Sequence, residues 1–141
     1  MTPGLRISIV DPDEDYLGIE VAADSGRFAG TTRIYAGLDE LSIFASQIAG
    51  FPTTAEDQRN YEFGSTESGV AGGFALLRFH CLAGAGHPAL EVIIEDDQQR
   101  HEIASARFAF QFAAADLDRF VTRLHHIERN RSGEATLPAT A

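Results

Sequence analysis

The chain has no lysine, no tryptophan, one methionine and a single cysteine, Cys81. One cysteine excludes an intramolecular disulfide framework, which is typical of proteins that stay in a reducing compartment. No apolar stretch approaches the roughly 18 residues that a transmembrane helix needs. The first residues carry one arginine, a very short apolar run and then acids, a pattern unlike a secretory signal peptide. We therefore expect a cytoplasmic protein that has no membrane partner.

Positive charge is also scarce. The eleven basic residues, all arginine, stand against 21 acidic ones, which gives a net charge of −10. Residues 1–67 hold twelve of the acids and four of the arginines, so the first half of the chain is the more acidic. Such a surface repels nucleic acid and attracts a basic protein partner. The alternative is that the charge serves only to keep the protein soluble.

The length of 141 residues predicts one domain with a core that needs no covalent staples. We expect residues 1–129 to form a single α+β domain. Residues 130–141 show no apolar periodicity, and we expect them to be a disordered C-terminal tail.

The stretch Gly73–Asp97 organises the rest of the prediction. Two apolar runs, Phe74–Leu82 and Ala89–Glu95, flank a short connection rich in glycine. Both runs are rich in branched and aromatic residues and too short for a typical helix, so they predict an antiparallel strand pair. Apolar residues fall on both faces of the first run, which predicts that the pair lies in the centre of its sheet.

Alternating polar and apolar residues predict strands before and after this pair. The expected strands are residues 5–9, 16–23, 27–35, 61–63 and 102–112. A turn that places Gly26 in the left-handed region joins the second and third of these strands. Phe28, Thr32 and Ile34 are expected to point inward from the third strand, and Tyr35 outward.

Two segments have helical spacing instead. Their apolar stripes are Leu38, Leu41, Phe44, Ala45 and Ile48 in the first segment, and Leu117, Phe120, Val121 and Leu124 in the second. Gly50 predicts the end of the first helix. The order βββ-α-ββββ-α predicts a two-layer α+β fold, with a mainly antiparallel sheet of about six to seven strands and both amphipathic helices on one face.

No metal or other cofactor is expected. Asp11, Asp13 and Asp15 have the opening spacing of a calcium-binding loop, but Tyr16 stands where that loop needs glycine and Ala22 where it needs glutamate. His80 and Cys81 are neighbours on a strand, so their side chains point to opposite faces. With His87 and His101 they form none of the usual zinc spacings.

No catalytic residue is assigned either, because no nucleophile stands in an activating motif. Two sets of residues remain as candidate sites. The first is an acidic interaction surface made of Asp11, Asp13, Glu14, Asp15, Asp96 and Asp97. The second is a pocket at the central strand pair lined by Arg78, His80 and Glu91, where a small molecule could bind or react. The alternative for the second set is that Arg78 and Arg107 simply pair with Glu91 and Glu95 across the sheet.

Five segments carry a resemblance to known proteins: DYLGIEV, GRFAGTTRIYAG, LDELSIFASQIAGFP, GGFALLRFHC and ARFAFQF followed by ADLDRFVTRL. Together they cover about residues 15–128 and resemble a group of small bacterial α+β domains, some of them assigned as immunity proteins of polymorphic toxin systems. The resemblance implies a non-enzymatic protein that binds and occludes a toxin, and an acidic surface suits a basic nuclease.

Three possibilities for function therefore stay open. The preferred interpretation is a non-enzymatic module that binds a protein, and the acidic charge favours a basic one. A small-molecule-binding domain or an enzyme with a pocket at the central strand pair is the alternative. A homodimer formed through an exposed sheet face is compatible with either one.

Overall fold

The computed structural model describes residues 2–64, 73–82, 86–96 and 103–140. These residues form an α+β fold of eight strands and two helices. In chain order the elements are β1 (Gly4–Pro12), β2 (Leu17–Asp24), β3 (Ala29–Ala36), α1 (Glu40–Ile48), β4 (Arg59–Gly64), β5 (Phe74–Cys81), β6 (Pro88–Asp96), β7 (Ala104–Gln111), α2 (Ala114–Asn130) and β8 (Glu134–Pro138). The predicted α+β class and the order of the first nine elements are confirmed.

The strands form two sheets, so the prediction of a single sheet was wrong. One sheet has the order β3-β2-β1-β8 and the other β4-β5-β6-β7, and all pairs are antiparallel. The helix α1 stands between β3 and β4 in the sequence, so no tight turn makes these two strands pair. The chain starts a new sheet after α1.

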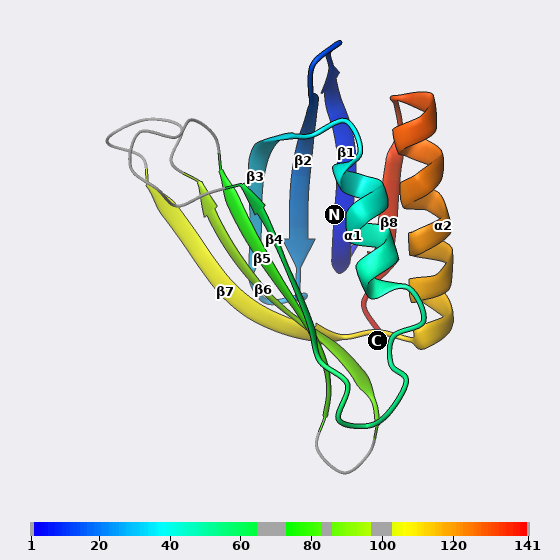
Figure 1. Ribbon diagram of the computed structural model, residues 1–141. Helices are drawn as coiled ribbons and strands as arrows, with labels where there is room; N and C mark the ends of the chain where they lie inside the picture. Colours follow the sequence, from blue (N-terminus) through cyan, green and yellow to red (C-terminus); the bar gives the residue numbers. More distant parts are fainter. Residues whose placement is uncertain (1, 65–72, 83–85, 97–102, 141) are drawn as a thin grey trace.

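The two helices fill the opening between the sheets and do not cover one face of a single sheet, which corrects the predicted layering (Figure 1). The strand β3 contacts all four strands of the second sheet. On the other side, α2 packs on β8, α1 packs on α2, and α1 reaches β4. The sheets and helices thus enclose one core, in which the ring of Phe44 lies 4.9–6.2 Å from the rings of Tyr61, Phe63, Phe79 and Phe120.

The expected central strand pair is confirmed. The strands β5 and β6 lie inside the second sheet and pair from Phe74 opposite Glu95 to Cys81 opposite Pro88. Leu77 and Phe79 face the core, whereas Arg78 and His80 face outward. The outer face of this sheet is the one on which the predicted pocket residues lie.

The two sheets meet where β3 crosses the second sheet. The buried hydroxyl of Thr32 donates to the main-chain oxygen of Glu95 (2.9 Å), and the main-chain N–H of Gly73 donates to the main-chain oxygen of Arg33 (2.8 Å). The inward positions of Thr32 and Ile34 are confirmed. Phe28 was wrongly expected to point inward: it precedes β3 and is 66% exposed.

The last residues also correct the prediction. Residues 134–138 were expected to belong to a disordered tail, but they form β8, which pairs with β1. Ala135 and Leu137 alternate with exposed neighbours and are fully buried in the core. The turn before the strand places Arg131 and Gly133 at positive φ, which reverses the chain after α2.

Candidate functional site

The acidic turn between β1 and β2 projects from one end of the molecule (Figure 1). It carries Asp11, Asp13, Glu14 and Asp15, and none of these four carboxylates forms an ion pair with a described residue. The guanidinium of Arg131 donates to the main-chain oxygen of Asp13. The turn is held by its own hydrogen bonds, among them the main-chain N–H of Asp15 to Oδ1 of Asp13 (3.1 Å).

A pair of tyrosines lies at the base of this turn. The rings of Tyr16 and Tyr35 pack edge to face with their centroids 5.2 Å apart, and the hydroxyl of Tyr16 donates to Oδ2 of Asp11 (3.1 Å). That hydrogen bond, with burial and the nearby carboxylates, raises the pKa of Tyr16. Tyr35 is 63% exposed on the outer face of the first sheet. We call these residues, Asp11, Asp13, Glu14, Asp15, Tyr16 and Tyr35, the acidic–tyrosine patch.

A glycine explains how this patch is assembled. Gly18 stands opposite both Asp11 on β1 and Tyr35 on β3. A Cβ atom at position 18 would lie 2.7 Å from the Cβ of Asp11, so only glycine leaves room for the side chain of Asp11 above β2. The register shifts by one residue between Ile9 and Asp11, which turns the end of β1 and exposes Val10.

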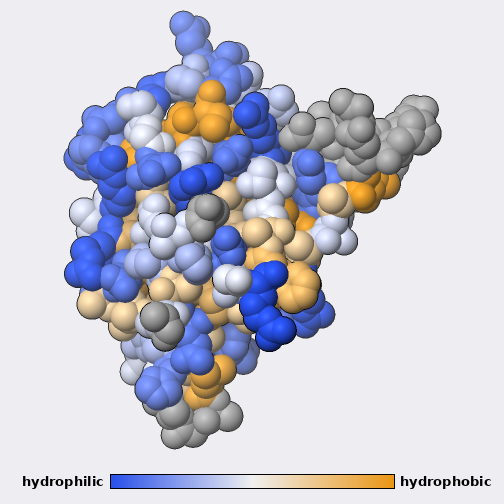
Figure 2. Space-filling view, turned by 180° about the vertical axis from the view of Figure 1, so that it is seen from behind, coloured by the Kyte–Doolittle hydropathy of each residue, from blue (hydrophilic) through white to orange (hydrophobic). Residues whose placement is uncertain are grey.

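The patch also has apolar surface beside its charges. Figure 2 shows a hydrophilic projection at the top of the molecule above a hydrophobic patch. Val10, next to Asp11 in the chain, is an exposed large apolar residue. Charged groups around a few exposed aromatic and aliphatic side chains are typical of protein–protein contact surfaces.

The other two residues of the predicted acidic surface do not join this patch. Asp96 ends β6, and its Oδ1 lies 3.5 Å from the hydroxyl of Thr32, beside the middle of β3. The acidic turn lies beyond the far end of β3, since Leu17 pairs with Ala36. Asp97 lies outside the described residues. Asp96 therefore lies apart from the four acids of the turn, and the predicted surface is not one continuous feature.

The predicted pocket residues are brought together on the outer face of the second sheet. Arg78, His80 and Glu91 line a shallow hollow of about 330 Å³, together with Gln58, Asn60 and Phe79. Glu91 accepts from Arg78 (3.1 Å) and, with its other oxygen, from Arg107 (3.1 Å). The predicted cross-strand pairing of Arg78 and Arg107 with Glu91 is thus confirmed, whereas neither forms an ion pair with Glu95.

The ion pairs explain the electrostatics of this hollow. Partial burial would raise the pKa of Glu91, but the hydrogen bonds and charges of Arg107 and Arg78 outweigh that effect and lower the pKa. The Nδ1 atom of His80 lies 3.4 Å from the main-chain oxygen of Arg78. The carboxylate of Glu91 is thus shared between Arg78, which lines the hollow, and Arg107, which lies beside it.

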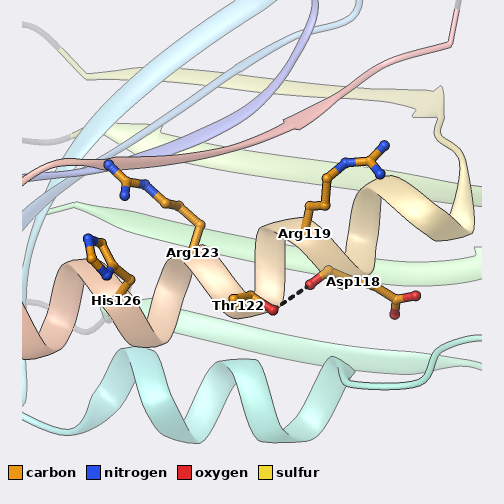
Figure 3. A pocket seen from close by; sticks show the side chains of 5 residues that line it. All are labelled: Asp118, Arg119, Thr122, Arg123 and His126. Atoms are coloured by element: carbon orange, nitrogen blue, oxygen red, sulfur yellow. Dashed lines mark hydrogen bonds between the residues drawn. The ribbon is translucent and has the colours of Figure 1, made fainter.

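Another hollow, of about 450 Å³, runs along the exposed side of α2 (Figure 3). It is lined by Asp118, Arg119, Thr122, Arg123 and His126. Figure 3 shows the Asp118 carboxylate extending away from the Arg123 guanidinium, which donates to the main-chain oxygen of Glu134 (2.9 Å). Side chains of one helix diverge from each other, so this hollow lacks the converging polar groups of a catalytic site.

The described residues contain no group of three or more histidine, cysteine, aspartate or glutamate side chains that could hold a metal ion. His80 and Cys81 lie on opposite faces of β5, and His87 is exposed in the connection to β6. His101 lies outside the described residues. Neither helix of the described ranges is long and apolar enough to cross a lipid bilayer.

Comparison with known proteins gives no match: no protein-family model, no curated protein and no solved structure is similar to this chain.

Proposed function

We propose that this protein is a non-enzymatic binding module that holds a basic protein partner through the acidic–tyrosine patch. The observation that supports it is that four carboxylates, none in an ion pair with a described residue, lie on a projecting turn beside the edge-to-face rings of Tyr16 and Tyr35. Tyrosine supplies a large contact area at a small cost in side-chain entropy and is enriched among the residues that dominate binding energy. The surrounding charge would speed the encounter with a basic partner.

The internal hydrogen bonds of the turn support the same function. The bond from Tyr16 to Asp11 and the bond from Arg131 to the main chain of Asp13 fix the turn before any partner arrives. A surface that is ordered in advance loses less conformational entropy on binding. The overall net charge of −10 adds a long-range attraction for the same basic partner.

The test is quantitative cross-linking of the tagged chain in extracts of its native source, followed by affinity measurements on the protein recovered. We expect Tyr35→Ala to weaken binding about thirtyfold, the effect of losing one dominant aromatic contact. We expect Glu14→Arg to weaken it about tenfold, mainly through a slower association rate. Added salt should weaken the binding of the wild-type chain.

The matched control is Glu62→Arg, which makes the same charge reversal on exposed β4, in the other sheet. This variant should bind like the wild type. Equal affinity of all three variants for the recovered partner, or recovery only of acidic proteins, would contradict the proposal. The resemblance to immunity proteins implies that the partner is a basic toxin, in which case co-expression should protect cells from that toxin and Tyr35→Ala should remove the protection.

The hollow around Arg78 supports a second candidate function, the binding of a small anion. The specific observation is that Arg78 shares the carboxylate of Glu91 with Arg107. The same arginine lines the hollow together with His80 and the amides of Gln58 and Asn60. Calorimetric titration with small carboxylates and phosphate is the test. We expect Arg78→Gln to abolish binding and Glu62→Gln to leave it unchanged. A titration without heat of binding would count against this candidate.

A further inference from the structure

The strand β7 is an edge of the second sheet, and no described strand pairs with its outer side. The main-chain N–H and C=O groups of successive residues point alternately toward β6 and away from it. Phe112, just beyond the strand, donates its N–H inward to Pro88, whereas the main-chain oxygen of Gln111 points outward and accepts from Thr140 (2.8 Å). The outward-pointing groups of β7 are therefore those of its odd-numbered residues.

Three of these residues have unpaired main-chain groups. Ser105, Arg107 and Ala109 form no outward main-chain hydrogen bond with any described residue, and all three are exposed. The strand has no proline and no bulge, and its pairing with β6 is continuous from Ala104 to Gln111. Natural proteins usually block such an edge, because its free N–H and C=O groups invite another strand.

Apolar surface accompanies this edge. Ile103, directly before β7, is 69% exposed, and Phe28 is exposed to a similar extent. The residues that follow them, Ala29 to Thr31 and Ala104 to Ala106, line one small hollow together, so the two side chains start from neighbouring backbone segments. Figure 2 shows hydrophobic atoms exposed on the side of the molecule that β7 occupies in Figure 1.

We propose that β7 pairs with β7 of a second copy of this chain, forming a two-fold dimer with a continuous eight-stranded sheet. The occupant is a second copy because the unpaired stretch is self-complementary in one register. A two-fold axis at Ala106 places Ser105 opposite Arg107 of the second copy and Ile103 opposite Ala109 of the second copy. All the free outward groups from Ser105 to Ala109 then find partners.

Two other registers, with the axis farther along the strand, are unfavourable. An axis at Arg107 would place two arginines directly opposite each other, which destabilises a strand pair. An axis at Phe108 would place Gln111 opposite Ser105 of the second copy, but the main-chain oxygen of Gln111 is already bonded to Thr140. The axis at Ala106 avoids both problems and sets two small side chains against each other at the centre.

Sedimentation velocity at several concentrations tests the dimer, with dimer mass at twice 15.3 kDa. Ser105→Glu would face Arg107 of the second copy at two symmetric places, so it should tighten the dimer about fivefold. Ser105→Lys should weaken it by a similar factor. Ala109→Pro removes one outward N–H and should abolish the dimer, whereas Ala109→Thr keeps the N–H and should retain it.

Circular dichroism of each variant verifies that the chain is folded, and the two Ser105 variants keep the test valid if the proline variant unfolds. Two copies with a charge of −10 each repel one another, so added salt should strengthen the dimer, the opposite of its effect on a basic partner. A monomer at every concentration and salt level, or a dimer that responds equally to Ser105→Glu and Ser105→Lys, would overturn the proposal. Either result would leave the acidic–tyrosine patch untouched.

Discussion

The hydroxyl of Thr32 occupies the space that a side chain on residue 73 would need. A Cβ atom at Gly73 would lie 1.6 Å from Oγ1 of Thr32 and 3.0 Å from the main-chain oxygen of Arg33. Thr32 is buried and bonded to the main chain of Glu95, so it has no room to move away. This contact joins the two sheets at the crossing of β3 and β5.

Gly73→Ala should therefore destabilise the fold by about 3 kcal/mol, because the extra methyl group forces the two sheets apart. Chemical unfolding monitored by circular dichroism measures the loss. The matched control is Gly37→Ala, where the nearest atom to an added Cβ is Oδ1 of Asp39 at 3.6 Å. Equal stability of the two variants would contradict the close contact of the sheets.

The strand β8 gives a second prediction. Leu137 is fully buried on a strand that packs against α2, so Leu137→Ala should lower the free energy of unfolding by about 3 kcal/mol. Thr136→Ala, on the exposed side of the same strand, should change it by less than about 0.5 kcal/mol. If both variants unfold at the wild-type denaturant concentration, the end of the chain does not pair with β1.

Glu91 predicts a dependence of stability on pH. Its pKa is lower in the folded chain, since Arg107 and Arg78 outweigh the effect of burial, so the ionised carboxylate stabilises the fold. This contribution is present above the pKa of the unfolded chain and is lost as the pH falls through the folded pKa. Both arginines are well exposed, so we expect Glu91→Gln to cost about 1 kcal/mol at neutral pH.

Unfolding curves of the wild type and of Glu91→Gln, recorded from neutral to acidic pH, provide the measurement. The difference between the two proteins should shrink as the wild-type carboxylate becomes protonated. A difference that stays constant with pH would mean that the substitution acts through packing and not through the charge.

Tyr16 predicts a spectroscopic signature of the acidic–tyrosine patch. Its hydrogen bond to Asp11, then burial and nearby carboxylates, raise its pKa above the ordinary value, so the neutral form is favoured in the folded chain. In the Asp11→Asn variant, Tyr16 should ionise at a lower pH than in the wild type. A titration that follows the ultraviolet absorbance of tyrosinate measures this change. The corresponding stability is complete below the ordinary tyrosine pKa and is lost as the pH rises through the raised one.

Tyr61 is the internal control for that titration. Burial and the carboxylate of Glu40 raise its pKa as well, and it lies on β4, away from Asp11. Asp11→Asn should leave this second high titration unchanged. If the titrations of the variant and the wild type coincide throughout, the hydrogen bond between Tyr16 and Asp11 does not form in solution.

Some of the candidate site could be predicted from the sequence. The alternation around Arg78 and Glu91 places both on one face of neighbouring strands, and their pairing followed from that register. The acidic turn was recognised from its composition. The edge-to-face contact of Tyr16 with Tyr35 was not, because it depends on the pairing of β2 with β3 and on the gap that Gly18 leaves for Asp11.

The sequence by itself determined nine of the ten helices and strands, where Gly26 and Gly50 turn the chain, and which side chains of β7 face the core, because these features depend on local periodicity. Only the tertiary structure decided that there are two sheets, that β8 belongs to the domain and that Phe28 is exposed. Strand pairing between distant segments depends on which surfaces remain to be buried after the local elements form, and no short stretch of sequence contains that information.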